Sequence, residues 1–324
     1  MGGGTVLYEC DRNPKVWDNE RKIFQPEKIL ENPEAVVAIG CTPIKAVQDA
    51  LRKIGCQNEI VVYPWFSAYF YCGEVPKVAE LPKLLNAWID ENKSELLKLY
   101  DTNDEETKNT LEEMISERQA AKINFIPAER MLDFHKRPYF DDDKLNPVED
   151  ITLVDGGAFT GDSIESIFSR YGNHLKKIYA FEPDEINLNQ MKNNLQRLNL
   201  HNVTEYIPCG MYDKETELHF HSNGDESKLD DAGEITVHVK KIDDVVKEVV
   251  GKLYIKMDIE GAEMAALRGA EKTIRKYKPY MALCTYHRMD DVLEIPRYIK
   301  SICDGYKFYL RAGFHTECYA VPQD

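Results

Sequence analysis

The most informative segment of this chain is Leu153-Val154-Asp155-Gly156-Gly157-Ala158-Phe159-Thr160-Gly161-Asp162-Ser163. It starts as an apolar run and passes through an acid and three glycines, which predicts a buried strand, a tight turn and the start of a helix. A second apolar run, Ile178-Tyr179-Ala180-Phe181, ends on Glu182. Strand, glycine turn, helix, strand and acid in this order are typical of a fold that binds a nucleotide-type cofactor.

The spacing of the glycines indicates the kind of cofactor. A dinucleotide site has the pattern Gly-x-Gly-x-x-Gly and no acid directed at the phosphates, whereas here Asp155 precedes the turn and the spacing is Gly157-x-x-x-Gly161. An acid repels a phosphate but suits a ligand that carries an amino group and a sulfonium. The pattern therefore predicts S-adenosylmethionine, with the Glu182 carboxylate accepting hydrogen bonds from its ribose hydroxyls. We expect cofactor contacts from these residues: Asp155, Gly156, Gly157, Ala158, Gly161, Asp162, Ser163, Glu182, Pro183 and Asp258.

A third segment, Leu253–Glu263, again reads as a strand followed by a turn. Side chains alternate between the faces of a strand, so Lys256 and Asp258 project together and Glu260 can follow them. Charges on a central strand are costly to bury unless they line a site. The next apolar run ends beside His287, which places it at the same edge of the sheet. Asp258, Glu260 and His287 are therefore the candidate catalytic residues.

Over about residues 148–324 the chain resembles the FkbM-type methyltransferase family. The resemblance rests on these segments: Val154 to Ser163, Phe181-Glu182-Pro183, Lys240-Lys241-Ile242-Asp243-Asp244, Ile255 to Glu263, Tyr286-His287, Tyr306 to Arg311 and Tyr319 to Pro322. Its most specific element is Lys256-x-Asp258-x-Glu260-Gly261-Ala262-Glu263. The resemblance implies a Rossmann-like methyltransferase that uses S-adenosylmethionine, and it suggests O-methylation of a sugar or a related small molecule.

The length of 324 residues exceeds that of one Rossmann-like domain, so we expect two units. Residues 1–122 are interpreted as an N-terminal half-Rossmann and helical domain, residues 123–150 as a linker and residues 151–324 as the methyltransferase domain. Alternating strands and helices in the last part predict an α/β fold with a mostly parallel sheet and helices on both faces. Its final two strands are joined by a short turn, which predicts an antiparallel C-terminal hairpin.

Three finer expectations concern the rest of the chain. Residues 36–63 predict a strand, a helix and a second strand, without the glycines of a second cofactor loop. Residues 80–121 predict two amphipathic helices, the second opened by a capping box at Thr102, and their charged faces are either solvated or form a homodimer contact. The polar segment 222–234 is either a lid near the ligand edge or an ordinary surface loop.

Composition limits the classes of partner and compartment. A net charge of −15 disfavours nucleic acid as a partner. The sequence has no apolar run of the roughly 18 residues that span a bilayer and no signal-peptide pattern at its start. Its eight cysteines contain no Cys-x-x-Cys pair, so we expect reduced thiols and a cytoplasmic protein.

The chemistry at the predicted site leaves several possibilities. Methyl transfer to a hydroxyl needs the acceptor oxygen held in line with the methyl group, and a base for its proton. His287, Asp258 or Glu260 can supply that base, or the three together can hold a divalent metal that orients a diol. A nicotinamide-dependent oxidoreductase and a noncatalytic cofactor-binding protein of the same fold remain as alternatives, and the glycine turn by itself can be a simple connection.

Overall fold

A computed structural model of the chain describes residues 9–10, 15, 17–20, 22–39, 44–62, 81–120, 126–127, 139, 143–145, 149–222, 227–229, 235–312 and 316–323. The chain divides into two compact units. Unit 1 comprises Met1–Trp65 and Ile123–Lys136, and unit 2 comprises Phe66–Lys122 and Arg137–Asp324.

Unit 1 is built around a small sheet. Its elements are β1 (Glu9–Cys10), β2 (Ile23–Phe24), η2 (Pro26–Glu31), β3 (Val37–Ile39), α1 (Ile44–Lys53), β4 (Ile60–Val62) and β5 (Ile126–Pro127). Strands β3 and β4 pair in parallel on either side of α1 in the sequence, which confirms the predicted strand, helix and strand. Strand β5 pairs antiparallel with β4 and comes from the segment that the sequence assigned to a linker.

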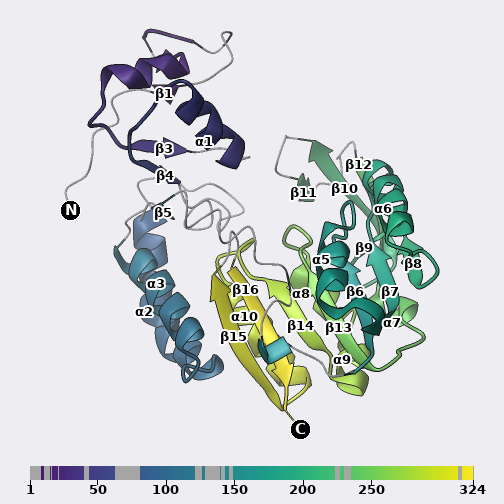
Figure 1. The fold of residues 1–324 in the computed structure, drawn as a ribbon. Helices are drawn as coiled ribbons and strands as arrows, with labels where there is room; N and C mark the ends of the chain where they lie inside the picture. The colour runs from purple at the N-terminus through teal and green to yellow at the C-terminus, as the bar shows by residue number, and fades with distance from the viewer. Residues whose placement is uncertain are drawn as a thin grey trace. The chain divides into compact units, whose positions relative to one another are not determined.

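Unit 2 contains a seven-stranded sheet in the order β15-β16-β14-β13-β6-β7-β8 (Figure 1). The strands are β6 (Ile151–Gly156), β7 (Leu175–Phe181), β8 (Thr204–Ile207), β13 (Lys252–Met257), β14 (Tyr280–Cys284), β15 (Tyr306–Ala312) and β16 (Thr316–Pro322). Only β16 runs opposite in direction to the other six strands of this sheet, so the predicted mostly parallel sheet with an antiparallel C-terminal hairpin is confirmed.

Helices accompany this sheet along the chain. They are α2 (Leu81–Leu99), α3 (Glu105–Ala120), η4 (Asp143–Leu145), α5 (Asp162–Tyr171), η5 (Gly172–His174), α6 (Glu185–Arg197), α7 (Ile242–Val245), α8 (Glu263–Arg268), α9 (Glu271–Tyr277) and α10 (Asp291–Ile302). A second sheet joins β9 (Gly210–Met211), β10 (Thr216–Ser222), β11 (Ser227–Leu229) and β12 (Ile235–Lys240). Strand β11 lies within the predicted polar loop, of which residues 223–226 and 230–234 are outside the described residues.

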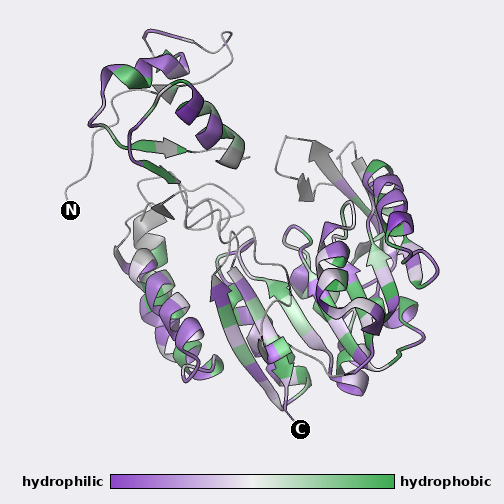
Figure 2. Cartoon of the chain, in the orientation of Figure 1, coloured by the Kyte–Doolittle hydropathy of each residue, from purple (hydrophilic) through white to green (hydrophobic). Residues whose placement is uncertain are grey.

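The central strands are buried on both faces, which explains why their sequences are nearly continuous apolar runs. On β6, Leu153 packs in one apolar cluster and Val154 in another, and on β13 Tyr254 and Ile255 divide in the same way. Because successive side chains point to opposite faces, the two clusters are the two faces of the sheet. Helices α5 and α6 contribute to one cluster, and α2, α3, α8, α9 and α10 to the other. Figure 2 shows hydrophobic residues along the strands and mixed stripes on the helices.

Helices α2 and α3 belong to unit 2, which corrects the expected N-terminal domain. The backbone N–H of Asp101 donates to the carbonyl of Phe308 at 2.8 Å, and Leu310 N–H donates to the Thr107 hydroxyl at 3.2 Å. These contacts fix the helices beside β15.

The cap of α3 also differs from the predicted one. Asp104, rather than Thr102, accepts the hydrogen bond from Thr107 N–H at 2.9 Å, so the helix begins after Asp104. The same carboxylate oxygen lies 2.6 Å from Nη1 of Arg311, whose side chain is only 4% exposed. Arg311 therefore anchors α3 to the sheet.

The described cysteines Cys10, Cys56, Cys209, Cys284, Cys303 and Cys318 are unpaired, while Cys41 and Cys72 lie outside the described residues. Within the described part of the chain, no helix combines the length and the apolar composition that a membrane span needs.

Candidate functional site

The glycine turn after β6 is packed directly against the residues that follow β13. Gly157 has a φ of +69°, and a Cβ there would lie 2.0 Å from the carbonyl oxygen of Asp258. Beneath the turn, Nζ of Lys256 donates to the carbonyls of Gly156 and Gly157 at 3.0 and 2.8 Å. The turn therefore needs glycine for its contact with the neighbouring segment, and a buried ammonium group holds its shape.

Asp155 lies inside the protein below this turn. Its side chain is fully buried, with Oδ1 3.1 Å from Nζ of Lys256 and Oδ2 accepting from the Ser163 hydroxyl at 2.6 Å. Burial raises the pKa of Asp155. Burial alone would lower the pKa of Lys256, but the charges of Asp155 and Asp258 outweigh it and the net pKa is raised, so Lys256 stays an ammonium. Asp155 and Ser163, both expected to touch a cofactor, thus support the turn from below.

Glu182 stands at the end of β7, next to the glycine turn. Its two carboxylate oxygens accept hydrogen bonds from the N–H groups of Phe159 at 2.8 Å and Asp184 at 2.9 Å. Burial raises the pKa of Glu182. The acid predicted for the ribose is therefore held in one orientation by backbone donors at the edge of the sheet.

Asp258 follows β13 and is held by two phenols. Its Oδ2 accepts from the Tyr139 hydroxyl at 2.8 Å, and its Oδ1 accepts from the Tyr286 hydroxyl at 2.9 Å. Burial is the main reason that the pKa values of both tyrosines are raised, so both hydroxyls keep their protons and remain donors. Tyr139 therefore orients a candidate catalytic acid.

His287 lies among the carboxylates at this edge. Its Nε2 is 3.6 Å from Oδ1 of Asp258 and 3.4 Å from Oε2 of Glu260, and its Nδ1 is 3.0 Å from Oε1 of Glu263. The Glu263 side chain is fully buried and also accepts from the Ile259 N–H at 2.9 Å. The structure thus brings together Asp258, Glu260 and His287, the three residues that the sequence predicted.

The negative charge around His287 changes its protonation. Burial alone would lower the pKa of His287, but the carboxylates of Glu260 and Glu263 outweigh it and raise the pKa to about 10. Nearby Asp291 is also buried, and burial together with the charge of Glu263 raises its pKa to about 8. At neutral pH His287 is therefore an imidazolium, which has no lone pair with which to take a proton.

Two residues at this edge have a strained backbone. Phe159 and Glu260 have φ values of +47° and +55°, in the left-handed region that residues other than glycine rarely adopt. Phe159 is 52% exposed although it is apolar, and it lies on the glycine turn. Strain of this kind is found at functional sites more often than elsewhere.

The remaining predicted residues surround the glycine turn in different ways. Gly156 and Ala158 are buried, and the N–H of Ala158 donates to the Phe181 carbonyl at 3.0 Å. Gly161 precedes α5 with a φ of +84°, while Asp162 and Pro183 are exposed. Four residues around Asp258 and His287 were not predicted as site residues from the sequence: Tyr139, Glu263, Tyr286 and Asp291. The run Glu260-Gly261-Ala262-Glu263 carried a signal for Glu263, whereas nothing in the sequence joined Tyr139 to Asp258.

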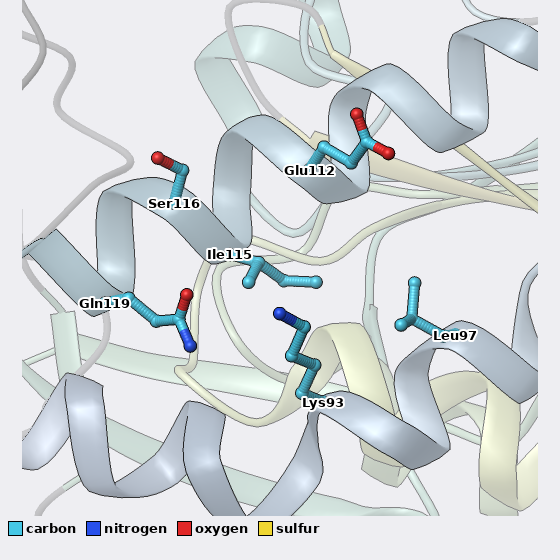
Figure 3. Close-up of a pocket in the computed structure, with 6 residues that line it drawn as sticks. All are labelled: Lys93, Leu97, Glu112, Ile115, Ser116 and Gln119. Atoms are coloured by element: carbon cyan, nitrogen blue, oxygen red, sulfur yellow. The ribbon is translucent and has the colours of Figure 1, made fainter.

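A separate pocket of about 540 Å³ lies between α2 and α3 (Figure 3). Its lining is Lys93, Leu97, Glu112, Ile115, Ser116 and Gln119. It contains none of the residues at the carboxyl edge of the sheet, and its mixed side chains do not form a set of groups suited to catalysis. We assign the chemistry to the edge of the sheet.

One solved methyltransferase structure shares the fold of this chain. The crystal structure of a methyltransferase FkbM from Methylobacillus flagellatus KT aligns with a TM-score of 0.64 and 22% identity, covering 97% of this chain and 83% of that one. A precorrin-6y C5,15-methyltransferase from Geobacter metallireducens GS-15 aligns at a TM-score of 0.36 and 11% identity, covering 61% and 89%. A SAM dependent methyltransferase from Aquifex aeolicus aligns at a TM-score of 0.32 and 15% identity, covering 54% of this chain and 84% of that one. The last two scores are too low to establish a shared fold.

The family comparison concerns the part of unit 2 that holds the site. A search of curated proteins found no match. A family model described as methyltransferase FkbM domain matches residues 155–310, which run from the acid below the glycine turn into β15. The expected membership is confirmed: this part of the chain belongs to the FkbM methyltransferase family.

Proposed function

We propose that the chain transfers the methyl group of S-adenosylmethionine to a hydroxyl of a sugar or a related small molecule. The observation that carries this proposal is the position of Glu182, fixed at the end of β7 beside the glycine turn. A carboxylate has about four lone-pair sites, so two are left for ribose hydroxyls after the Phe159 and Asp184 N–H groups have bonded.

Apolar surface next to Glu182 suits the adenine of the cofactor. Phe159 donates its N–H to Glu182 and leaves its side chain 52% exposed, and Ile186, in the first turn of α6, is 69% exposed. Exposed apolar side chains beside a polar anchor are the common composition of a small-molecule site. The same edge disfavours a pyrophosphate, because α5 begins with the exposed acid Asp162 at the end of the helix where phosphates bind. This observation and the methyltransferase family count against the nicotinamide alternative.

The residues after β13 and β14 have the properties needed to receive the acceptor. S-adenosylmethionine supplies a methyl group that its sulfonium already activates, so the protein's main task is to orient the acceptor oxygen. Asp258, Glu260 and His287 form a polar group at the carboxyl edge that can hydrogen-bond a polyhydroxylated molecule. Asp258 or Glu260 can take the hydroxyl proton, whereas His287 can do so only after its own proton has been displaced.

Calorimetric titration with S-adenosylmethionine, S-adenosylhomocysteine and NAD tests the cofactor. We expect the two adenosyl ligands to bind and NAD not to bind. Transfer of labelled methyl from S-adenosylmethionine to a panel of glycans, with a protein and an RNA as comparison acceptors, then tests the substrate class. Binding of NAD alone would overturn the proposal, and cofactor binding without methylation of any acceptor would favour the noncatalytic alternative.

A further inference from the structure

A group of side chains after β13 and β14 has the form of a cation site. Strands β13 and β14 are parallel neighbours, with Met257 opposite Leu283, so the residues that follow them meet at one edge. One ligand atom each from Asp258, Glu260 and His287 lies within 4.8 Å of the other two.

The distances fit a first-row divalent cation after a small contraction. Nε2 of His287 is 3.6 Å from the Asp258 carboxylate and 3.4 Å from that of Glu260. A cation with bonds of about 2.1 Å holds two ligands about 3.0 Å apart at right angles, and about 3.4 Å apart at tetrahedral angles. The histidine nitrogen therefore needs to approach each carboxylate by only a few tenths of an ångström, and the two carboxylate oxygens lie within 4.8 Å of each other.

His287 is oriented as metal-binding histidines are. Its side chain is 5% exposed, and neither ring nitrogen makes a hydrogen bond of good geometry among the described residues, although Nδ1 is 3.0 Å from Oε1 of Glu263. Metal-ligating histidines commonly direct the other ring nitrogen to a carboxylate in this way, which leaves the second nitrogen's lone pair for the metal. Here Nε2 is the nitrogen that faces Asp258 and Glu260.

The surroundings carry more negative charge than one imidazolium can balance. The carboxylates of Asp258, Glu260 and Glu263 all lie within 4 Å of the ring, and Asp291 is 1% exposed nearby. Burying anions without compensation is costly, and a divalent cation supplies the compensation.

The two carboxylate ligands, Asp258 and Glu260, are oriented in different ways. The Tyr139 and Tyr286 hydroxyls each donate to one oxygen of Asp258 and so fix the plane of its carboxylate. Glu260 adopts a φ of +55°, and its side chain is 79% exposed while its Oε2 faces His287. The strained backbone directs an otherwise solvated acid toward the ring and leaves the site open to ions.

We propose that Asp258, Glu260 and His287 bind one divalent cation, with Glu263 orienting the histidine. Two carboxylates and one imidazole lie between the oxygen sets preferred by Mg²⁺ and the nitrogen-rich sets preferred by Zn²⁺, so Mn²⁺ is the best-matched probe. The cation site stands on the geometry alone. Its use, to hold an acceptor oxygen for methylation, rests on the proposed function.

Titration of the full chain with Mn²⁺, followed by the loss of the free-ion electron paramagnetic resonance signal, tests the site. We expect one Mn²⁺ per chain, and Glu260→Gln, which keeps the size of an exposed side chain, should weaken binding at least about tenfold. Asp290→Asn is the matched control, because it removes a nearby exposed charge that is not among the three ligands, and it should change affinity less than about threefold. Thermal unfolding of each variant shows that it is folded.

Two results would overturn the cation site. One is no Mn²⁺ binding by the wild-type chain at millimolar ion, and the other is equal weakening in Glu260→Gln and Asp290→Asn, which would mean attraction by diffuse charge. Titration of the same samples with S-adenosylmethionine separates this inference from the proposed function. If the chain binds S-adenosylmethionine but not Mn²⁺, only the cation site is contradicted. If it binds Mn²⁺ but not S-adenosylmethionine, only the methyl-transfer proposal is contradicted.

Discussion

Replacement of Gly157 by alanine tests whether the glycine turn is packed as tightly as the structure shows. The new Cβ would lie 2.0 Å from the Asp258 carbonyl oxygen, which is 1.0 Å inside the 3.0 Å limit that real Cβ contacts respect. Both atoms are attached to backbone, so neither can rotate away. Either the turn or the segment after β13 must move.

The expected loss of folding stability in Gly157→Ala has two parts. A non-glycine residue at a φ of +69° costs roughly 1–2 kcal/mol in backbone conformation, and forcing extra volume into a packed site typically costs about 1–3 kcal/mol. We therefore expect Gly157→Ala to lower the free energy of unfolding by about 2–5 kcal/mol. For a domain of this size each kcal/mol shifts the melting temperature by roughly 2–4 °C.

Gly172→Ala sets an upper limit for the backbone part. Gly172 belongs to the same unit, and no atom lies within 4 Å of the position of its Cβ, but its φ of +52° and ψ of −127° are less favourable for alanine than a left-handed helical backbone. Urea unfolding of both variants, followed by circular dichroism, gives the two losses of stability. If Gly157→Ala lowers the free energy of unfolding by less than about 2 kcal/mol, the close approach of the turn to Asp258 is wrong.

Three further predictions concern single side chains. Asp104→Ala should lower the free energy of unfolding by roughly 2–4 kcal/mol in urea unfolding, because buried Arg311 loses its nearer carboxylate, keeping only Glu106 at 3.5 Å, and α3 loses its cap. A loss under about 1 kcal/mol would contradict this. The pKa of His287 is raised from 6.5 to about 10, so its protonated form stabilises the fold fully below pH 6.5 and loses that effect as the pH rises through 10. His287→Gln should therefore flatten the decline of the free energy of unfolding between these pH values. An unchanged decline would refute the raised pKa. Glu182→Ala should weaken S-adenosylmethionine binding about tenfold or more by calorimetry, because a charged acceptor of ribose hydroxyls is lost, and wild-type affinity would sink the assignment of this acid.

The sheet could be predicted from the sequence because its strands carry strong local signals. Residues around Leu153 and Ile255 form apolar runs bounded by glycines and acids, and a strand buried on both faces requires such a run. The edge where Asp258, Glu260 and His287 meet followed from the same reasoning, since parallel strands bring their carboxyl ends together. Local pattern and topology were sufficient for these features.

Contacts between distant segments could not be predicted in this way. The amphipathic stripe of α2 shows that one face is buried, but not that the hairpin with α3 packs beside β15 instead of joining the N-terminal unit. Thr102 and Asp104 are both good caps, and only the position of Arg311 favours Asp104. Tyr139 reaches Asp258 across 119 residues of sequence, and no pattern near either residue indicates this contact.

The conformation of Glu260 has a consequence for how this family can change over time. Glycine adopts a left-handed backbone without strain, whereas glutamate does not. One nucleotide substitution converts a glutamate codon into a glycine codon, so a less strained residue at this position is readily reached by mutation. A lineage that accepts the change keeps the fold of the turn and loses one carboxylate. Glutamate should therefore persist only in lineages whose chemistry still uses that carboxylate, and glycine at this position should mark relatives in which selection for it has ended.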